Sequence, residues 1–150
     1  MVGRTFAKAQ GLAGLRVGAV AAVPVTIARL RRVLPPYSIN VAAATALIAA
    51  LGDQAHLADY RRQVAHSREL VYAACQRLGL TCWPSFANFV LVRVGDAAPA
   101  VVEALRTRGV FVRDRSTQPG CAGCIRITTG IVAHTEACVR ALEEVLCAAR

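Results

Sequence analysis

Two adjacent prolines, Pro35 and Pro36, divide the chain into two unequal parts. Proline has no backbone N–H and disfavours helical backbone in the residue before it, so no helix is expected to run through this point. The segment before the prolines predicts a Gly-rich loop, a short strand and a helix over Pro24–Val33, which are too small to bury a core. The segment after them is long and apolar enough to fold by itself. We therefore expect two parts, residues 1–36 and residues 37–150.

The larger part predicts helices first and then a mixture of strands and helices. Val41–Leu51 is nearly all Ala, Leu, Ile and Val, which is typical of a buried helix, and Ser38 or Asn40 can cap it. A longer helix is expected over Gln54–Leu78, with Gly79 just after its end. From Thr81 onward we expect strands at Phe89–Val94, Val110–Arg113 and Cys124–Thr128, and helices at Ala97–Arg108 and Ile131–Ala149. This order predicts an α/β fold whose helices pack on one face of a small sheet.

The composition of the 150-residue chain limits the classes of partner. Apolar residues make up 55% of the chain, so we expect a buried core rather than disorder. The formal net charge is +9, and such a charge attracts nucleic acid, anionic membranes or phosphorylated small molecules. The basic residues are scattered, however, and aromatic residues make up only 5%, which argues against nucleic acid as the partner.

No stretch of the sequence predicts a membrane span. The longest apolar run, Val41–Leu51, has 11 residues, whereas a bilayer needs about 20. The N-terminal residues lack the apolar region of a secretory signal. We therefore expect a cytoplasmic protein whose six cysteines are reduced thiols.

Cys121 and Cys124 have the spacing of a metal-binding or redox pair. A zinc site usually needs a second such pair, or histidines at a defined spacing, and the remaining cysteines and histidines supply neither. A redox pair prefers a helix N-terminus, whereas this pair leads into a predicted strand. We expect no metal site, and we expect Cys138 and Cys147 to pack as small apolar groups on the last helix.

Lys8 is the only lysine of the chain, and it precedes a Gly-rich stretch that ends at Arg16. A lysine that binds a cofactor covalently needs a pocket that keeps its amine partly neutral, and small neighbours leave room for a planar ring. An arginine beyond the loop can hold a phosphate through two parallel hydrogen bonds. On spacing alone, a surface lysine and a packing arginine remain the simpler interpretation.

The segment from Arg4 to Gly18 resembles the cofactor-lysine segment of the class I and II aminotransferases, most of all their histidinol-phosphate aminotransferase branch. Further stretches resemble the same family in the same order: Pro35–Tyr37, Ser85–Val92, Gly109–Asp114 and Cys124–Gly130. The resemblance implies a fold-type I scaffold that uses pyridoxal 5′-phosphate (PLP). Residues 1–36 would be a remnant of its large PLP-binding domain, and residues 37–150 its small α/β domain.

The same resemblance assigns roles to five residues. Lys8 would hold the cofactor covalently and then carry a proton, while Arg16, assisted by Thr5, would bind the PLP phosphate. Arg126 would bind the carboxylate of an amino acid or the phosphate of histidinol phosphate, with Arg113 as its partner on the substrate. The implied enzyme is a homodimer that moves an amino group between an amino-acid substrate and a keto acid. Histidinol phosphate and 2-oxoglutarate, a pair from histidine biosynthesis, are the first expectation.

Two positions depart from the family pattern: Ala7 stands where serine is usual, and Gln10 where an aromatic or other apolar residue is common. In the family, the aspartate that keeps the pyridine nitrogen protonated lies before the lysine, as does the aromatic that stacks on the ring. We therefore expect this chain to be the C-terminal part of a longer enzyme. Two alternatives remain open: an inactive fragment that acts as an interaction module, and a basic protein that binds phosphoanions or nucleic acid.

Overall fold

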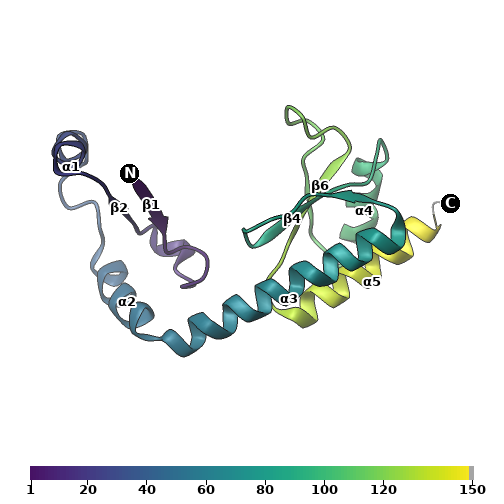
Figure 1. Cartoon of the computed structure of the whole chain (residues 1–150), viewed down its shortest axis with the longest axis horizontal. Coiled ribbons are helices and arrows are strands. Elements are labelled where there is room, and N and C mark those ends of the chain that lie inside the picture. The colour runs from purple at the N-terminus through teal and green to yellow at the C-terminus, as the bar shows by residue number, and fades with distance from the viewer. Residues whose placement is uncertain (149–150) are drawn as a thin grey trace. The chain divides into compact units, whose positions relative to one another are not determined.

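The computed structural model describes residues 1–148, which belong to two compact units. Unit 1 is Met1–Asp59 and unit 2 is Tyr60–Arg150 (Figure 1). The expected division into residues 1–36 and 37–150 concerns the domains of the full-length family, and it stays a prediction.

Unit 1 is built on a two-stranded antiparallel ribbon of β1 (Val2–Thr5) and β2 (Gly18–Ala21). The register places Val2 opposite Ala21 and Thr5 opposite Gly18. Glycine is needed at position 18 because a Cβ there would lie 2.9 Å from the carbonyl oxygen of Arg4. The ribbon thus closes the loop between its strands into a tight, defined segment.

Two helices follow the ribbon in unit 1. α1 (Pro24–Arg31) begins with proline in its first turn, where the missing N–H costs nothing, and it ends before the double proline. α2 (Val41–Gly52) is capped as expected by Asn40, whose side-chain oxygen accepts a 2.7 Å hydrogen bond from the N–H of Ala43.

The expectation that α2 is buried all round is wrong for this chain. Ala43 is its one fully buried residue, and Ile48 is 76% exposed. The reason is the small size of unit 1, whose core consists of Phe6, Val17 and Ala43 with partly buried leucines around them. Such a core covers one stripe of an apolar helix and leaves the others in solvent.

Unit 2 contains most of α3 (Gln54–Leu78), which begins in unit 1 and ends, as expected, just before the left-handed Gly79. The remaining elements are β3 (Thr81–Cys82), β4 (Phe89–Arg93), α4 (Ala98–Thr107), β5 (Arg113–Asp114), β6 (Cys124–Thr128) and α5 (Val132–Ala148). The four strands form an antiparallel sheet in the order β3-β4-β6-β5.

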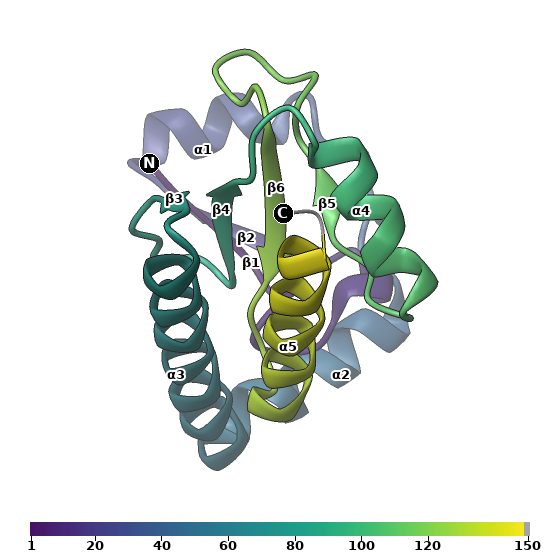
Figure 2. The same ribbon diagram turned by 90° about the vertical axis from the view of Figure 1, so that its right-hand side faces the viewer.

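One face of this sheet is covered by helices, as the sequence predicts. Val90 and Val92 on β4, and Ile125 and Ile127 on β6, are at most 1% exposed and pack against residues of α3, α4 and α5. Figure 2 shows α3 and α5 side by side in front of the strands. Because side chains alternate along a strand, Leu91 on β4 and Arg126 on β6 point to the opposite face.

The strand expected at Val110–Arg113 is shorter and later in the structure, where β5 pairs only through Arg113 and Asp114. The predicted end of the last helix, Ala149, lies outside the described residues. In the described part of the chain, no single helix is long and apolar enough to cross a membrane, although α2 and α3 together, with the break between them, would meet that test.

Candidate functional site

The loop between β1 and β2 brings Thr5, Lys8 and Arg16 into one short segment of unit 1. Its backbone is fixed from within: the N–H of Leu12 donates to the carbonyl of Phe6 at 3.1 Å. The hydroxyl oxygen of Thr5 accepts from the N–H of Ala7 at 3.2 Å. Thr5 and Arg16 therefore stand at the two ends of the loop and Lys8 lies within it.

Lys8 is exposed and occupies a turn in which its carbonyl accepts a 2.9 Å hydrogen bond from the N–H of Gly11. Gly11 has a φ of 70°, which glycine adopts without strain. Gln10 is only 9% exposed, so the departure from an apolar residue places an amide inside unit 1. The turn leaves the lysine amine accessible to a ligand.

Arg16 has left-handed backbone with a φ of 54°, which costs a non-glycine residue about 1–2 kcal/mol. One guanidinium nitrogen, Nη1, donates to the carbonyl of Ala13 at 3.1 Å, and the remaining donors are exposed. Asn40, which caps α2, donates from Nδ2 to the carbonyl of Leu15 at 3.3 Å. These two hydrogen bonds fix the backbone immediately before the strained residue.

Arg113 and Arg126 form the second group, in unit 2. They are directly opposite each other on β5 and β6, so both side chains lie on the sheet face that the helices leave open. The Arg126 guanidinium carbon lies 5.2 Å from the centre of the Phe89 ring, a cation–π contact. The buried Nε of Arg126 has no hydrogen-bond partner among the described residues.

The charge of Arg126 is poorly compensated. Burial lowers its pKa from the ordinary arginine value, and the positive charges of Arg113 and then Arg115 lower it further. Like charges opposite each other in a sheet are destabilising. A bound anion would accept a hydrogen bond from the buried Nε of Arg126 and would offset the positive charge of the neighbouring arginines.

A pocket of about 440 Å³ in unit 2 is lined in part by β6. Neither Arg113 nor Arg126 is among its lining residues. Phe111, Ile127, His134 and Cys138 are among its lining residues. His134 is the one titratable imidazole in that lining, so the pocket has the character of an apolar hollow rather than an anion site.

The cysteines of the described residues are all free thiols. Cys138 is buried as expected, whereas Cys147 is exposed, because it lies on the outer face of the last turns of α5. Within residues 1–148, no three His, Cys, Asp or Glu side chains gather closely enough to hold a metal ion.

Comparison with known proteins identifies the class of this chain. The model of the aminotransferase class I and II family matches residues 1–146, so the chain belongs to that family. The histidinol-phosphate aminotransferase of Moorella thermoacetica is 38% identical over 143 residues, which are 95% of this chain and 37% of that protein. Histidinol-phosphate aminotransferase 2 of Ralstonia nicotianae is 43% identical over 97% of this chain and 40% of its own length.

The structural comparison agrees. The histidinol-phosphate aminotransferase of Sinorhizobium meliloti, solved in complex with pyridoxal-5′-phosphate, matches with a TM-score of 0.86 and 34% identity. The match covers 99% of this chain and 41% of that one. The expected resemblance and the expected fold class, an α/β fragment of a fold-type I transferase, are both confirmed. The chain spans about two fifths of the length of these relatives.

The residues of the unit 1 loop fit a phosphorylated carbonyl cofactor in their chemistry. The segment offers one accessible primary amine, one guanidinium with free donors and one hydroxyl. The Thr5 hydroxyl already accepts a hydrogen bond from Ala7, yet it keeps its own O–H to donate. Ala7 itself offers no hydroxyl, so the phosphate would depend more on Arg16.

The sequence analysis did not single out Arg115, whose positive charge helps to lower the pKa of Arg126. The signal was present in the two-residue spacing, which places residues 113 and 115 on one face of a strand. What the sequence could not supply was the pairing of β5 with β6.

Proposed function

We propose that this chain is part of a PLP-dependent aminotransferase in which Lys8 holds the cofactor and Arg16, with Thr5, binds its phosphate. One observation carries the proposal: the β1–β2 loop gathers the only lysine of the chain and a strained Arg16 in one short, internally bonded segment. The family match and the likeness to a PLP complex of 34% identity support it.

When bound, PLP supplies an electron sink for the carbon that carries the amino group. Lys8 Nζ would take the proton from that carbon and deliver it to the atom that gains it in the transfer. A deprotonated lysine can fill this role. Arg16 would fix the phosphate with its free guanidinium donors and so orient the ring. Thr5 would add one donor from the opposite end of the loop.

On the substrate side, we propose that Arg113 and Arg126 bind the anionic group. Their opposed guanidinium groups and the unpartnered Nε of Arg126 match a carboxylate or phosphate. Histidinol phosphate is the proposed amino donor, on the strength of the relatives' names. The proposed acceptor, 2-oxoglutarate, is implied by the sequence resemblance alone. The homodimer implied by the family is part of the same proposal.

Covalent trapping tests the cofactor site. The chain is mixed with limiting PLP, reduced with borohydride and mapped by peptide mass, with Lys8 and the N-terminal amine as the two possible amines. We expect saturable labelling of Lys8 that is lost in Arg16→Ala and kept in the matched control Arg4→Ala. Labelling confined to the N-terminal amine, or equal labelling in both variants, would contradict the proposal.

A non-catalytic interaction module is the second candidate, because unit 1 exposes many large apolar side chains. Val23, Val25 and Val33 are 60–76% exposed, and Tyr37 and Val41 are more exposed still. Exposed apolar surface on this scale favours association with another protein surface. Sedimentation across a range of concentrations would show association, and a monomer at every concentration would remove this candidate.

A further inference from the structure

The open face of the unit 2 sheet carries more positive charge than the Arg113–Arg126 pair alone. The hydrogen-bond ladder between β5 and β6 continues one step past the strand, because the N–H of Arg115 donates to the carbonyl of Cys124 at 2.9 Å. Arg115 follows Arg113 by two residues along this ladder, so both side chains leave the same face. Arg115 is half-buried there.

The acidic residue between them does not compensate this charge. Asp114 alternates with its neighbours, and its carboxylate accepts a 2.7 Å hydrogen bond from the N–H of Ser116. That bond lowers the pKa of Asp114, so the carboxylate is already engaged by its own turn. The positive charges of Arg113 and Arg115 both reach Arg126, whose pKa they lower after burial has done so.

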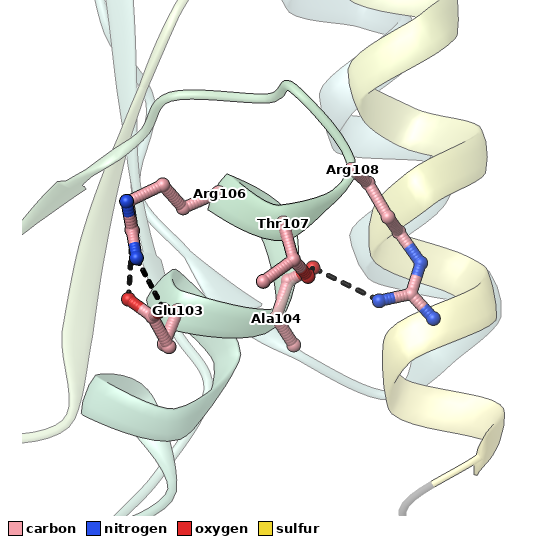
Figure 3. A network of polar contacts seen from close by, with 5 residues as sticks. All are labelled: Glu103, Ala104, Arg106, Thr107 and Arg108. Carbon is pink, nitrogen blue, oxygen red and sulfur yellow. Dashed lines mark hydrogen bonds and ion pairs between the residues drawn. The ribbon is translucent and has the colours of Figure 1, made fainter.

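Three other arginines of unit 2 have carboxylate neighbours. Arg106 on α4 is held by Glu103 at 2.6 and 2.8 Å (Figure 3), and Arg108 lies 3.6 Å from Glu144. Arg77 pairs in the same way with Glu143. Within residues 1–148, by contrast, Arg113, Arg115 and Arg126 form no ion pair with a carboxylate. Arg113, Arg115 and Arg126 thus share one face of the sheet without a carboxylate partner, whereas Arg93 on β4 lies over the Trp83 ring.

We propose that Arg115 is a third guanidinium of the substrate-anion site and that it favours a phosphate monoester over a carboxylate. The proposal rests on the proposed function and names the substrate class of the same site. A carboxylate brings one negative charge and two oxygens, whereas a phosphate monoester brings nearly two charges and three acceptor oxygens. Three forks of donors are therefore better satisfied by the phosphate.

Anion titration of the full chain tests this assignment. Inorganic phosphate and acetate are titrated separately at pH 8 and constant ionic strength. Binding is read from the backbone amide NMR shifts of residues 113–116 and 124–128, which excludes any anion bound at Arg16. In Arg115→Gln, we expect phosphate affinity to fall about 5- to 10-fold while acetate affinity changes less than about twofold. In Arg113→Gln, both affinities should fall.

Arg108→Gln is the matched control, because it removes one positive charge from the same unit at a residue that already has a carboxylate neighbour. It should leave both affinities within about twofold of the original chain. The proposal is overturned if Arg115→Gln behaves like Arg108→Gln, or if it weakens the binding of both anions equally. It is also overturned if phosphate at about 50 mM, a concentration that would occupy even a weak site, shifts none of these amide signals.

The two proposals fail in different experiments. Absence of PLP labelling at Lys8 would contradict the cofactor site in unit 1 and leave the discrimination between phosphate and acetate in unit 2 unaffected. Equal affinity of the original chain for both anions would contradict the role of Arg115 alone.

Discussion

Arg16, which we propose binds the cofactor phosphate, has a left-handed backbone conformation. This conformation is unfavourable for a residue with a Cβ atom. Strained backbone persists where the surrounding structure fixes it, and it often marks a functional position. Here the hydrogen bonds to the carbonyls of Ala13 and Leu15, just before Arg16, supply that constraint. Two variants at this position can separate the backbone contribution from that of the guanidinium.

We expect Arg16→Gly to be more stable than Arg16→Ala by about 0.5–1 kcal/mol, because glycine removes the left-handed penalty and alanine retains it. Both variants lack the guanidinium, so both should lose PLP labelling at Lys8. Hydrogen exchange of the β1 and β2 amides measures the difference in stability. Slower exchange in Arg16→Ala than in Arg16→Gly would show that the left-handed backbone carries no strain.

The buried thiols predict how the stability of unit 2 depends on pH. Burial raises the pKa of Cys138 to about 11, and burial followed by the neighbouring Cys82 raises that of Cys75 to about 12. A thiol in the unfolded chain titrates near 9.0. Above pH 9 the unfolded state therefore loses protons that the folded state keeps, so stability falls as pH rises towards 11.

The slope should be up to about 1.4 kcal/mol per pH unit for each thiol. Urea unfolding under reducing conditions at pH 8, 9 and 10, followed by circular dichroism, measures it. Cys138→Ala should flatten the slope, whereas Cys147→Ala, at an exposed thiol, should not. Equal slopes in the two variants would contradict the assignment.

Two glycines show how the elements of unit 2 are joined. The N–H groups of Val94 and Gly95, just after β4, donate to the carbonyl of Gly123, just before β6. A Cβ on Gly123 would lie 2.8 Å from the carbonyl oxygen of Gly95. Gly120, in the same loop, has a similar positive φ of 75° but open space around it.

We expect Gly123→Ala to lower the free energy of unfolding of unit 2 by at least about 1 kcal/mol more than Gly120→Ala. Both substitutions place alanine in left-handed backbone, so the difference isolates the steric clash with Gly95. Urea unfolding followed by the fluorescence of Trp83, the only tryptophan, measures both. Equal losses would mean that the loop moves away from Gly95 at little cost.

At this scale, the sequence predicts elements well where the signals are local. The bounds of α3 and β6 agree with their patterns, and Asn40 and Gly79 cap helices as expected. β1 was not predicted, because its four residues are stabilised by pairing with β2 rather than by their own pattern. The exposure of α2 was also missed, since apolar composition shows that a helix can be buried but not whether a surface covers it.

The candidate site divides in the same way. Lys8 and Arg16 could be named from one continuous motif, and their roles stay predictions. Arg113 and Arg126 could be named only by resemblance, because their opposition depends on pairing between strands separated by a loop. Pairing across such a loop is a tertiary property, which no short pattern contains.

For the whole molecule, the length of the chain governs the expected activity. Its 150 residues match about two fifths of the length of these relatives, so an isolated chain of this sequence has no counterpart to the other three fifths. We expect the purified chain to show no measurable transamination between histidinol phosphate and 2-oxoglutarate, even where Lys8 is labelled by PLP. A coupled assay for glutamate checks this expectation. Glutamate formation by the original chain that disappears in Lys8→Arg would contradict it.

The reactive side chains of this protein are sorted between its two units. Both primary amines, Lys8 and the N-terminus, belong to unit 1, whereas all six cysteines belong to unit 2, with Cys147 exposed. An amine-directed dye therefore marks one unit, and a maleimide dye marks the other, without any substitution. Energy transfer between the two dyes would report the distance between the units in solution, and its change on adding PLP or phosphate would reveal whether ligands draw them together.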